Sequence, residues 1–186
     1  MPDGAAEIRF VTSNKGKLRE AREILGREIA AIAIDVDEIQ SLDVSKVVRE
    51  KARRSYGLVK KPVLVEDTGL YIKALNGFPG ALIKWALETI GNKGLCEMLG
   101  GKDRKAYSET AVCIYDGRRA KIFTGRTDGR VSKSPKGHST FGWDPIFMPE
   151  GKNLTYAEMG GIEKNKISSR AKAFKKLKMH LARTKR

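Results

Sequence analysis

The sequence predicts an α/β fold built on a mixed sheet, and three observations support this. Apolar β-prone segments alternate with amphipathic segments of helical spacing over the first half of the chain. Two β-rich segments then flank Asp116-Gly117, a dipeptide typical of tight hairpin turns. The chain has 186 residues, a length typical of one domain. Alternating strands and helices favour parallel pairing, and a hairpin adds antiparallel strands, so we expect a mixed sheet flanked by helices.

The first half of the chain supplies the alternating elements. Short apolar runs predict strands, and apolar residues three or four positions apart predict helices. In order, the patterns indicate a strand at Ile8–Thr12, a helix at Lys15–Leu25, a β-prone run at Ile29–Val36, a helix at Val44–Val59 and a strand at Val63–Val65.

The second half begins with a turn at Gly77–Gly80 and ends in a basic helix. The same patterns apply to the elements between them. We expect a helix whose apolar face is Leu82, Trp85, Ala86 and Ile90, a second helix ending near Gly100, strands at Ala106–Tyr115 and Ala120–Thr127, a turn at Asp128-Gly129 with Val131 continuing the sheet, and a helix at Ile167–Leu181 that packs through Ala171, Phe174, Leu177 and Met179.

The charge of the chain indicates an anionic partner. There are 37 Lys and Arg residues against 22 Asp and Glu, a net charge of +15. Ten basic residues and a single acid lie between Gly161 and Arg186, so much of the excess belongs to the last segment. Nucleic acid, an anionic membrane surface and a small polyphosphate all fit such a charge.

The small numbers of cysteines and histidines, and the shortness of the apolar runs, exclude several classes of protein. The two cysteines, Cys96 and Cys113, lack metal-ligand spacing, which rules out a zinc knuckle. With only two histidines, a histidine-based triad or metal site is not expected. Scarce cysteines favour a reducing compartment, and we predict a cytoplasmic protein. No apolar run reaches the roughly 18–20 residues of a membrane span, and Met1–Phe10 lacks the apolar stretch of a signal peptide, so no membrane partner is expected.

A first candidate site is Thr12–Lys17, between the first strand and the first helix. Thr12, Ser13 or Asn14 can cap this helix and leave its N-terminal amides available for an anion. Lys15 and Lys17 lie in the first turn, where each cation costs about 0.3–1 kcal/mol against the helix dipole unless an anion offsets it. The alternative is an ordinary capped helix with surface lysines.

Two acidic clusters follow apolar segments. Glu66-Asp67-Thr68-Gly69 comes directly after the strand at Val63–Val65, and Asp35-Val36-Asp37-Glu38 follows Ile29–Ile34. Carboxylates at the ends of sheet strands occupy the position where α/β folds bind ligands. They could hold Mg²⁺ or activate a water molecule. A solvated turn and a polar loop are the alternatives.

Two further segments could contact a nucleotide. In Phe141-Gly142-Trp143-Asp144-Pro145, an aromatic face can stack on a base and a carboxylate can accept from ring N–H groups. In Glu163–Arg170, Ser168 or Asn165 can cap the last helix, while Lys164 and Arg170 can converge on anions. Hydrophobic packing and a solvated charged face are the alternatives.

Taken in order, these segments resemble the motifs of the Ham1 family of inosine triphosphate pyrophosphatases. The matching motifs are TSNKGK, EDTGL, GFPG, FGWDPIF and EKNKISSR, and the resemblance runs from about Ile8 to Phe174. It implies a long central mixed sheet and two lobes around a substrate cleft, within one domain of residues 1–186. It also implies a homodimer that uses Mg²⁺ to hydrolyse ITP, dITP and XTP to the monophosphate and pyrophosphate.

The resemblance also implies a role for individual residues. The phosphate-binding segment maps onto Thr12, Ser13, Asn14, Lys15, Gly16 and Lys17; the metal carboxylates onto Glu38 and Asp67; the catalytic base onto Asp67; other phosphate or substrate contacts onto Lys51 and Thr68; the nucleobase loop onto Phe141, Gly142, Trp143 and Asp144; and the last contacts onto Lys164, Ser169 and Arg170.

Two positions depart from the family pattern. Ser13 replaces a glycine, and Ser169 replaces a histidine in the closing motif. A seryl hydroxyl is shorter than imidazole and cannot become cationic, so the departure at Ser169 concerns how the 6-oxo group of the base is read. A Maf-type pyrophosphatase with another base preference is one alternative. A basic nucleic-acid-binding protein is another, although no nucleic-acid motif is present and aromatic residues make up only 7%.

Overall fold

A seven-stranded mixed sheet forms the centre of the molecule. The computed structural model describes residues 8–138 and 141–183. The sheet order is β2-β1-β3-β5-β6-β7, with β4 pairing with part of β3. Pairing is parallel from β2 through β1 to β3 and antiparallel elsewhere. The strands are β1 (Arg9–Val11), β2 (Ala31–Ile32), β3 (Val63–Ile72), β4 (Pro79–Gly80), β5 (Lys105–Tyr115), β6 (Ala120–Val131) and β7 (Phe147–Pro149).

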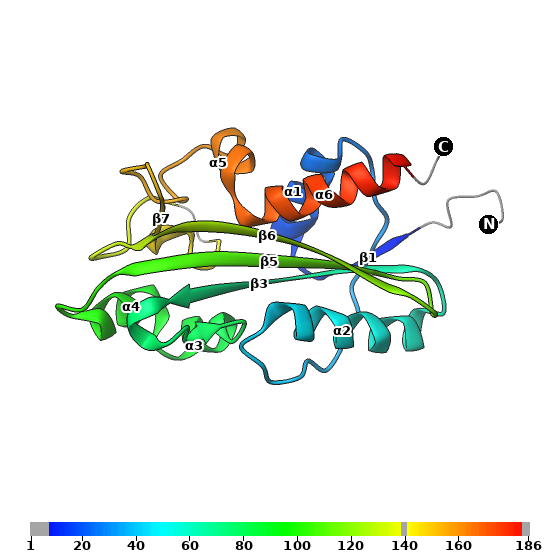
Figure 1. Cartoon of the computed structure of the whole chain (residues 1–186), viewed down its shortest axis with the longest axis horizontal. Coiled ribbons are helices and arrows are strands. Elements are labelled where there is room, and N and C mark those ends of the chain that lie inside the picture. The colour runs from blue at the N-terminus through cyan, green and yellow to red at the C-terminus, as the bar shows by residue number, and fades with distance from the viewer. Residues whose placement is uncertain (1–7, 139–140, 184–186) are drawn as a thin grey trace.

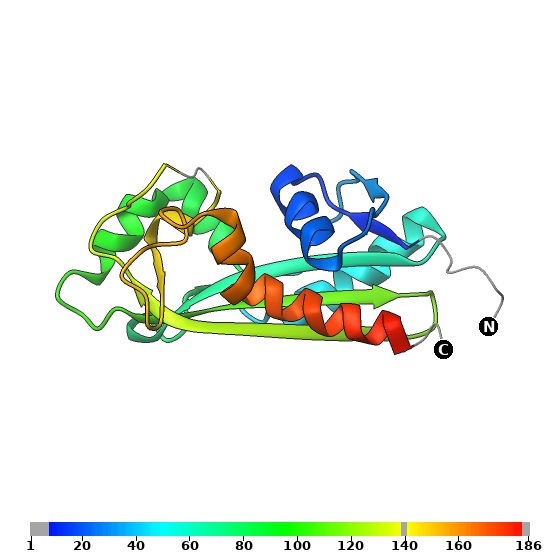
Figure 2. The same ribbon diagram turned by 90° about the horizontal axis from the view of Figure 1, so that it is seen from above.

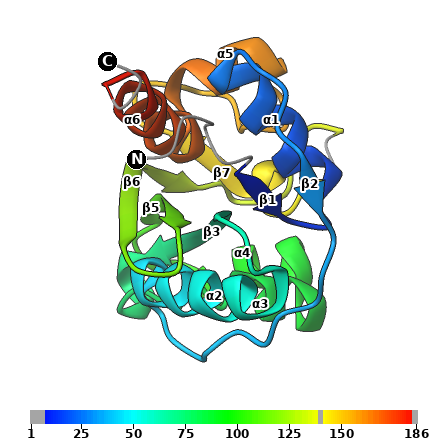
Figure 3. The same cartoon turned by 90° about the vertical axis from the view of Figure 1, so that its right-hand side faces the viewer.

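Helices cover both faces of this sheet. The helices are α1 (Lys15–Leu25), α2 (Val44–Val59), α3 (Ile83–Thr89), α4 (Gly91–Leu99), α5 (Gly161–Ile167) and α6 (Ser169–Arg183). Figure 1 and the end view in Figure 3 show α1, α5 and α6 on one face and α2, α3 and α4 on the other. The predicted mixed sheet flanked by helices is confirmed. Within the described ranges, no helix has the length and apolar character that crossing a membrane requires.

Each layer has its own buried contacts with the sheet. On one face, Phe174 of α6 packs edge-on against Phe10 of β1, with ring centroids 6.1 Å apart. On the other face, Val48 and Ala52 of α2 pack with residues of β3 and β5. A third cluster lies where α3 and α4 meet the far ends of β3 and β5 and the strand β7. Three buried clusters therefore fix the positions of the helices relative to the sheet.

Two strands are longer than the sequence predicts. β3 does not end at Val65 but continues to Ile72, because Leu70 and Ile72 are buried in the third cluster. β6 likewise runs through the expected turn at Asp128-Gly129 to Val131. Gly129 is there because a Cβ would lie 2.3 Å from the carbonyl oxygen of Met148, so only glycine lets β7 approach. Of the β-prone run Ile29–Val36, only Ala31 and Ile32 pair as a strand.

The predicted helices Lys15–Leu25 and Val44–Val59 have the observed bounds, but the closing helix does not. The observed α6 begins at Ser169, not at Ile167, and an unpredicted helix, α5, precedes it. Ser168 lies between the two helices, and its Oγ accepts a hydrogen bond from the Ala171 amide at 3.1 Å. Ser168 thus caps α6, as one of the two predicted candidates. The expected packing of Trp85 and Met179 is wrong, because both side chains are more than half exposed.

Candidate functional site

The candidate site is a cleft at a gap in the sheet. β1 pairs with β3 only at Val63 and Leu64, and β4, formed by the GFPG motif, pairs only at Leu70 and Tyr71. Within the described chain, the β3 edge at residues 65–69 therefore has no strand partner. A cleft of about 830 Å³ opens along this edge, within the range of small-molecule sites. In Figure 2, α1, β1 and β2 (blue) lie towards one end of the long strands, and α4 and β7 (green and yellow) lie towards the other.

Almost all the residues predicted for the site line this cleft. Lys15 and Gly16 are absent from the described lining; Lys15 is exposed, and Gly16 lies against Phe141, whose ring is 2.6 Å from where a Cβ would be. The predicted residues that do line it are Thr12, Ser13, Asn14, Lys17, Glu38, Lys51, Asp67, Thr68, Phe141, Gly142, Trp143, Asp144, Lys164, Ser169 and Arg170.

Strand alternation separates the two acids of the EDTG motif. Successive side chains of a strand point to opposite faces. Glu66 faces the α6 side, where it pairs with Arg170. Asp67 faces the α2 side, towards Glu38 and Lys51, which are close enough to shift its pKa. The alternative of a solvated turn is wrong, because Glu66 is only 2% exposed within a continuous strand.

One end of the cleft gathers lysines and carboxylates. Asn14 caps α1, and its Oδ1 accepts from the Lys17 amide at 3.0 Å. Lys51 of α2 is ion-paired with Glu38. Burial raises the pKa of Asp67 to about 6; Lys17 opposes the shift, and the carboxylates of Glu38 and Glu66 add to it. Asp67 is thus a carboxylate held beside other carboxylates, a setting that a cation would relieve.

This end of the cleft fits Mg²⁺ as an incomplete site. Glu38 and Asp67 offer the oxygen ligands that Mg²⁺ prefers. The described residues contain no group of three or more carboxylate, imidazole or thiol side chains that could hold a metal by themselves. The remaining ligands would therefore be phosphate or water oxygens, which is the usual way Mg²⁺ is shared with a nucleotide.

The other end of the cleft is aromatic and cationic. The Phe141 ring has Lys164 Nζ 4.5 Å and Arg170 Cζ 5.2 Å from its centroid. Trp143 lines the cleft and also packs edge-on against Phe147 at 5.4 Å, so the packing alternative holds for part of its surface. The amide side chain of Asn92 donates to the Gly142 carbonyl at 2.9 Å, which ties the loop to α4.

Buried ion pairs hold the two cations in place. Lys164 donates to Asp144 and, at 3.0 Å, to Glu20. Arg170 donates to Glu20 and to both carboxylate oxygens of Glu66, at 3.2 and 3.3 Å. Lys164 and Arg170 are each 6% exposed, so the alternative of a solvated charged face is wrong for them.

The pKa values follow from this arrangement. Burial alone would raise the pKa of Glu66, but Arg170, Lys17 and two hydrogen bonds outweigh it and lower the pKa to about 2. The pKa of Glu20 is also lowered, because Arg170 and Lys164 outweigh its burial. For Asp144 burial prevails over Lys164, and the pKa is raised.

Sequence reasoning missed the roles of Glu20 and Glu66. Glu20 is buried on α1, three residues after Lys17 and so on the same side of the helix. An acid on the buried side of a helix was the available signal, since such a group needs a cationic partner. That partner is supplied by residues more than 140 positions away.

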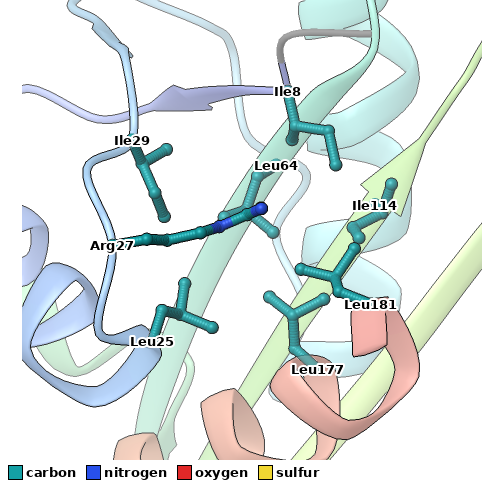
Figure 4. A pocket seen from close by; sticks show the side chains of 8 residues that line it. All are labelled: Ile8, Leu25, Arg27, Ile29, Leu64, Ile114, Leu177 and Leu181. Atoms are coloured by element: carbon teal, nitrogen blue, oxygen red, sulfur yellow. The ribbon is translucent and has the colours of Figure 1, made fainter. Parts of the chain in front are cut away.

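A second hollow in the described chain is too small to be a site. It has a volume of about 10 Å³, room for one water molecule at most. Figure 4 shows Arg27 reaching across it between aliphatic side chains of α1, β3, β5 and α6. It is a packing defect between these elements.

Comparisons with known proteins agree with the geometry. Residues 8–180 match the sequence model of the Ham1 family. The chain is 41% identical over 175 residues to a dITP/XTP pyrophosphatase of Methanopyrus kandleri, covering 91% of this chain and 93% of that protein. It is 44% identical over 194 residues to inosine triphosphate pyrophosphatase 2 of Trypanosoma cruzi, covering 97% and 98%. The solved structure of a HAM1 protein from Coxiella burnetii superposes with a TM-score of 0.80 at 29% identity, covering 95% and 99%.

Proposed function

Because this chain belongs to the Ham1 family, as its motifs predicted, we propose that it hydrolyses non-canonical purine nucleoside triphosphates to the monophosphate and pyrophosphate. The substrate class follows that of its relatives, which are named dITP/XTP or inosine triphosphate pyrophosphatases. The observation that carries the proposal is that one cleft gathers both a set of lysines and carboxylates and an aromatic ring with Arg170. Such a cleft matches a triphosphate at one end and a purine at the other.

The lysine end would bind the phosphates. Lys17 and Lys51 line the cleft, and the capped N-terminus of α1 adds amides and the positive end of its dipole. A nucleoside triphosphate carries about four negative charges, and the lysines offset them without a covalent step. Mg²⁺ bound by Glu38 and Asp67 would add positive charge against the phosphate oxygens.

Asp67 is the proposed base. A water molecule attacks the α-phosphorus in line, its oxygen forms the new bond, and the bond to the pyrophosphate oxygen breaks. Asp67 accepts the proton of that water. Asp67 lines the cleft, and a carboxylate in that position can serve as the general base for the attacking water.

The aromatic end would select the base. Phe141 offers a ring face for stacking, and Arg170 is a hydrogen-bond donor. Hypoxanthine and xanthine carry an acceptor at the purine 6-position where adenine carries an amino donor. Arg170 therefore favours the 6-oxopurines.

Three further features belong to this proposal. One is Mg²⁺ as the cofactor. Another is a homodimer in which each subunit is a single two-lobed domain. The third is a cytoplasmic location, which the buried, unpaired thiols of Cys96 and Cys113 support.

The decisive experiment is a substrate panel with a base-deficient variant. Pyrophosphate release from ITP, XTP, dITP, GTP, ATP, dTTP and UTP with Mg²⁺ would identify the preferred base. Asp67→Asn should lower kcat for ITP by roughly 10²-fold or more, because the variant cannot accept the proton. Asp128→Asn, on β6 outside the described lining of the cleft, is the matched control. A near-normal rate for Asp67→Asn would refute the assignment of the base.

The nucleic-acid alternative predicts a different outcome. A basic binding protein would show no triphosphate hydrolysis, and its affinity for DNA or RNA would fall steeply with salt. The same preparation used for the substrate panel can be tested in this way.

A further inference from the structure

Three hydroxyl groups connect α6 to the central strand of the cleft. Thr68 Oγ1 donates to Glu66 Oε1 at 2.5 Å. Thr68 Oγ1 lies 2.8 Å from Thr110 Oγ1, and Thr110 Oγ1 lies 2.9 Å from Ser169 Oγ. Thr68 and Thr110 are directly opposite in the pairing of β3 with β5, and Ser169 is the first residue of α6. The result is a continuous hydrogen-bonded chain from a carboxylate to a helix N-terminus.

The Glu66 carboxylate determines which hydroxyl group donates and which accepts in each of these hydrogen bonds. Glu66 is paired with the Arg170 guanidinium through both oxygens, so it is an ionised group that only accepts. Each hydroxyl has a single proton to donate. Thr68 donates its proton to Glu66 and must accept from Thr110, which in turn must accept from Ser169. The proton of Ser169 is therefore committed to Thr110.

The Ser169 hydroxyl can therefore offer a ligand only its lone pairs and not its proton. It lines the same cleft as Arg170 and Phe141, and it is 2% exposed, which leaves little room for another rotamer. A serine free to rotate could donate or accept and would not distinguish between bases. Fixed by Thr110, it can only accept.

We propose that Ser169 reads the substrate's purine as an obligate hydrogen-bond acceptor and that Thr110, as a positioning residue, imposes that polarity. The substrate class is a purine with a ring N–H beside its carbonyl group. Hypoxanthine, xanthine and guanine present this N–H, whereas adenine has a lone pair there and would meet the lone pairs of Ser169. The inference rests on the proposed function and adds an acceptor contact to the donor that Arg170 supplies.

The test compares ITP, GTP and ATP hydrolysis in variants of Thr110. Thr110→Val keeps the shape and removes the hydroxyl, so Ser169 is free to donate. We expect kcat/KM for ATP to rise and the ITP/ATP ratio of kcat/KM to fall about 3- to 10-fold, the effect of one uncharged hydrogen bond. Thr110→Ser keeps the hydroxyl and should restore the wild-type ratio. The ITP/GTP ratio should not change, because both bases carry the N–H.

A second variant and a control keep the test independent of folding. Ser169→Ala removes the acceptor and should lower kcat/KM for ITP. It also removes the lone pairs that adenine would meet, so the ITP/ATP ratio of kcat/KM should fall. Ser108 is fully buried on the same face of β5 as Thr110 and lies outside the described cleft lining, so Ser108→Ala should leave both the ITP/ATP and the ITP/GTP ratio at wild-type values. Thermal melting of each variant shows whether it is folded.

The outcomes separate this inference from the proposed function. A wild-type protein that hydrolyses no triphosphate refutes the proposed function itself. A wild-type protein that prefers ITP, together with an unchanged ITP/ATP ratio in folded Thr110→Val, refutes the inference alone. Equal ratios for Thr110→Val and Thr110→Ser would also refute it, because the hydroxyl would then have no effect.

Discussion

At the scale of single residues, Glu20 neutralises both buried cations of the cleft. Its two carboxylate oxygens accept hydrogen bonds from Lys164 and Arg170. Removing one partner of a buried ion pair costs about 3–5 kcal/mol, because the other charge is left without compensation. Glu20 thus holds the aromatic end of the cleft together from α1.

The stability of the protein should therefore depend on the ionisation of Glu20. Its pKa is lowered from 4.5 in the folded protein, so the stability it contributes is present above about pH 4.5 and is lost as pH falls below that value. Glu20→Gln should lower the free energy of unfolding by about 3 kcal/mol at pH 7 and make its decline in acid shallower.

Urea denaturation between pH 3 and pH 7, in roughly unit steps, measures both effects. The raised pKa of Asp144 has the opposite sign and is present in both proteins, so the difference between wild type and variant isolates Glu20. Parallel pH profiles for the two proteins would contradict the prediction.

The residues found from the sequence are those whose chemistry is local. Asn14 caps the helix that follows it, so neighbouring residues sufficed there, whereas the role of Lys51 came only from the resemblance to the family motifs. The partners of Arg170 could not be found in this way. Glu20 and Glu66 lie 150 and 104 positions from it, and only the packing of α1, α6 and β3 brings them together.

At the scale of elements, the position of α6 depends on a glycine in β6. A Cβ on Gly125 would lie 2.1 Å from the carbonyl oxygen of Ser169 and 2.6 Å from the amide of Ala173. Both contacts are with helix backbone, which cannot rotate away. The first turn of α6, with Ser169 and Arg170, is therefore seated directly on the sheet.

Gly125→Ala should displace that turn. We expect a loss of about 1–3 kcal/mol in unfolding free energy, together with a higher KM for ITP, because Arg170 moves with the helix. Gly57→Ala is the matched control: Gly57 is exposed in α2, a Cβ there would meet nothing within 4 Å, and the change should stabilise the helix by about 0.5–1 kcal/mol. Thermal melts and ITP kinetics of both variants measure these effects. If the two variants had the same stability and the same KM for ITP, close packing of α6 on Gly125 would be disproved.

The long strands show what local patterns leave out. Glu66-Asp67-Thr68-Gly69 is typical of a turn, yet β5 pairs with every one of these residues and holds them extended. The helix α5 was also missed, although Ser168, which separates it from α6, was a predicted cap. In both cases tertiary contacts decided the element, and local composition did not.

At the scale of the whole molecule, the +15 charge divides between the cleft and the surface. Lys17, Lys51, Lys164 and Arg170 line the cleft, whereas Lys175 and Lys176 are exposed on α6. Exposed charges act on a ligand through the field, which salt screens over about 8 Å at physiological ionic strength. The surface excess should therefore affect capture of the substrate and not the chemical step.

Lys175→Gln/Lys176→Gln should leave kcat for ITP unchanged, and kcat/KM should fall less steeply with added salt than in the wild type. Steady-state kinetics from about 20 to 500 mM KCl measure this, with Mg²⁺ held constant. A lower kcat at low salt would mean that these lysines act in the cleft after all.

The pairing of Glu20 with Arg170 has a consequence for biosynthesis. The two residues are 150 positions apart, and α1 leaves the ribosome long before α6 is made. Until α6 is made, Glu20 cannot pair with the Arg170 guanidinium, and the aromatic end of the cleft lacks the hydrogen-bond donor that Arg170 supplies. A nascent chain that has already formed β3, β5 and β6 would thus still be unable to recognise a base, and catalytic competence would begin only when the last helix docks.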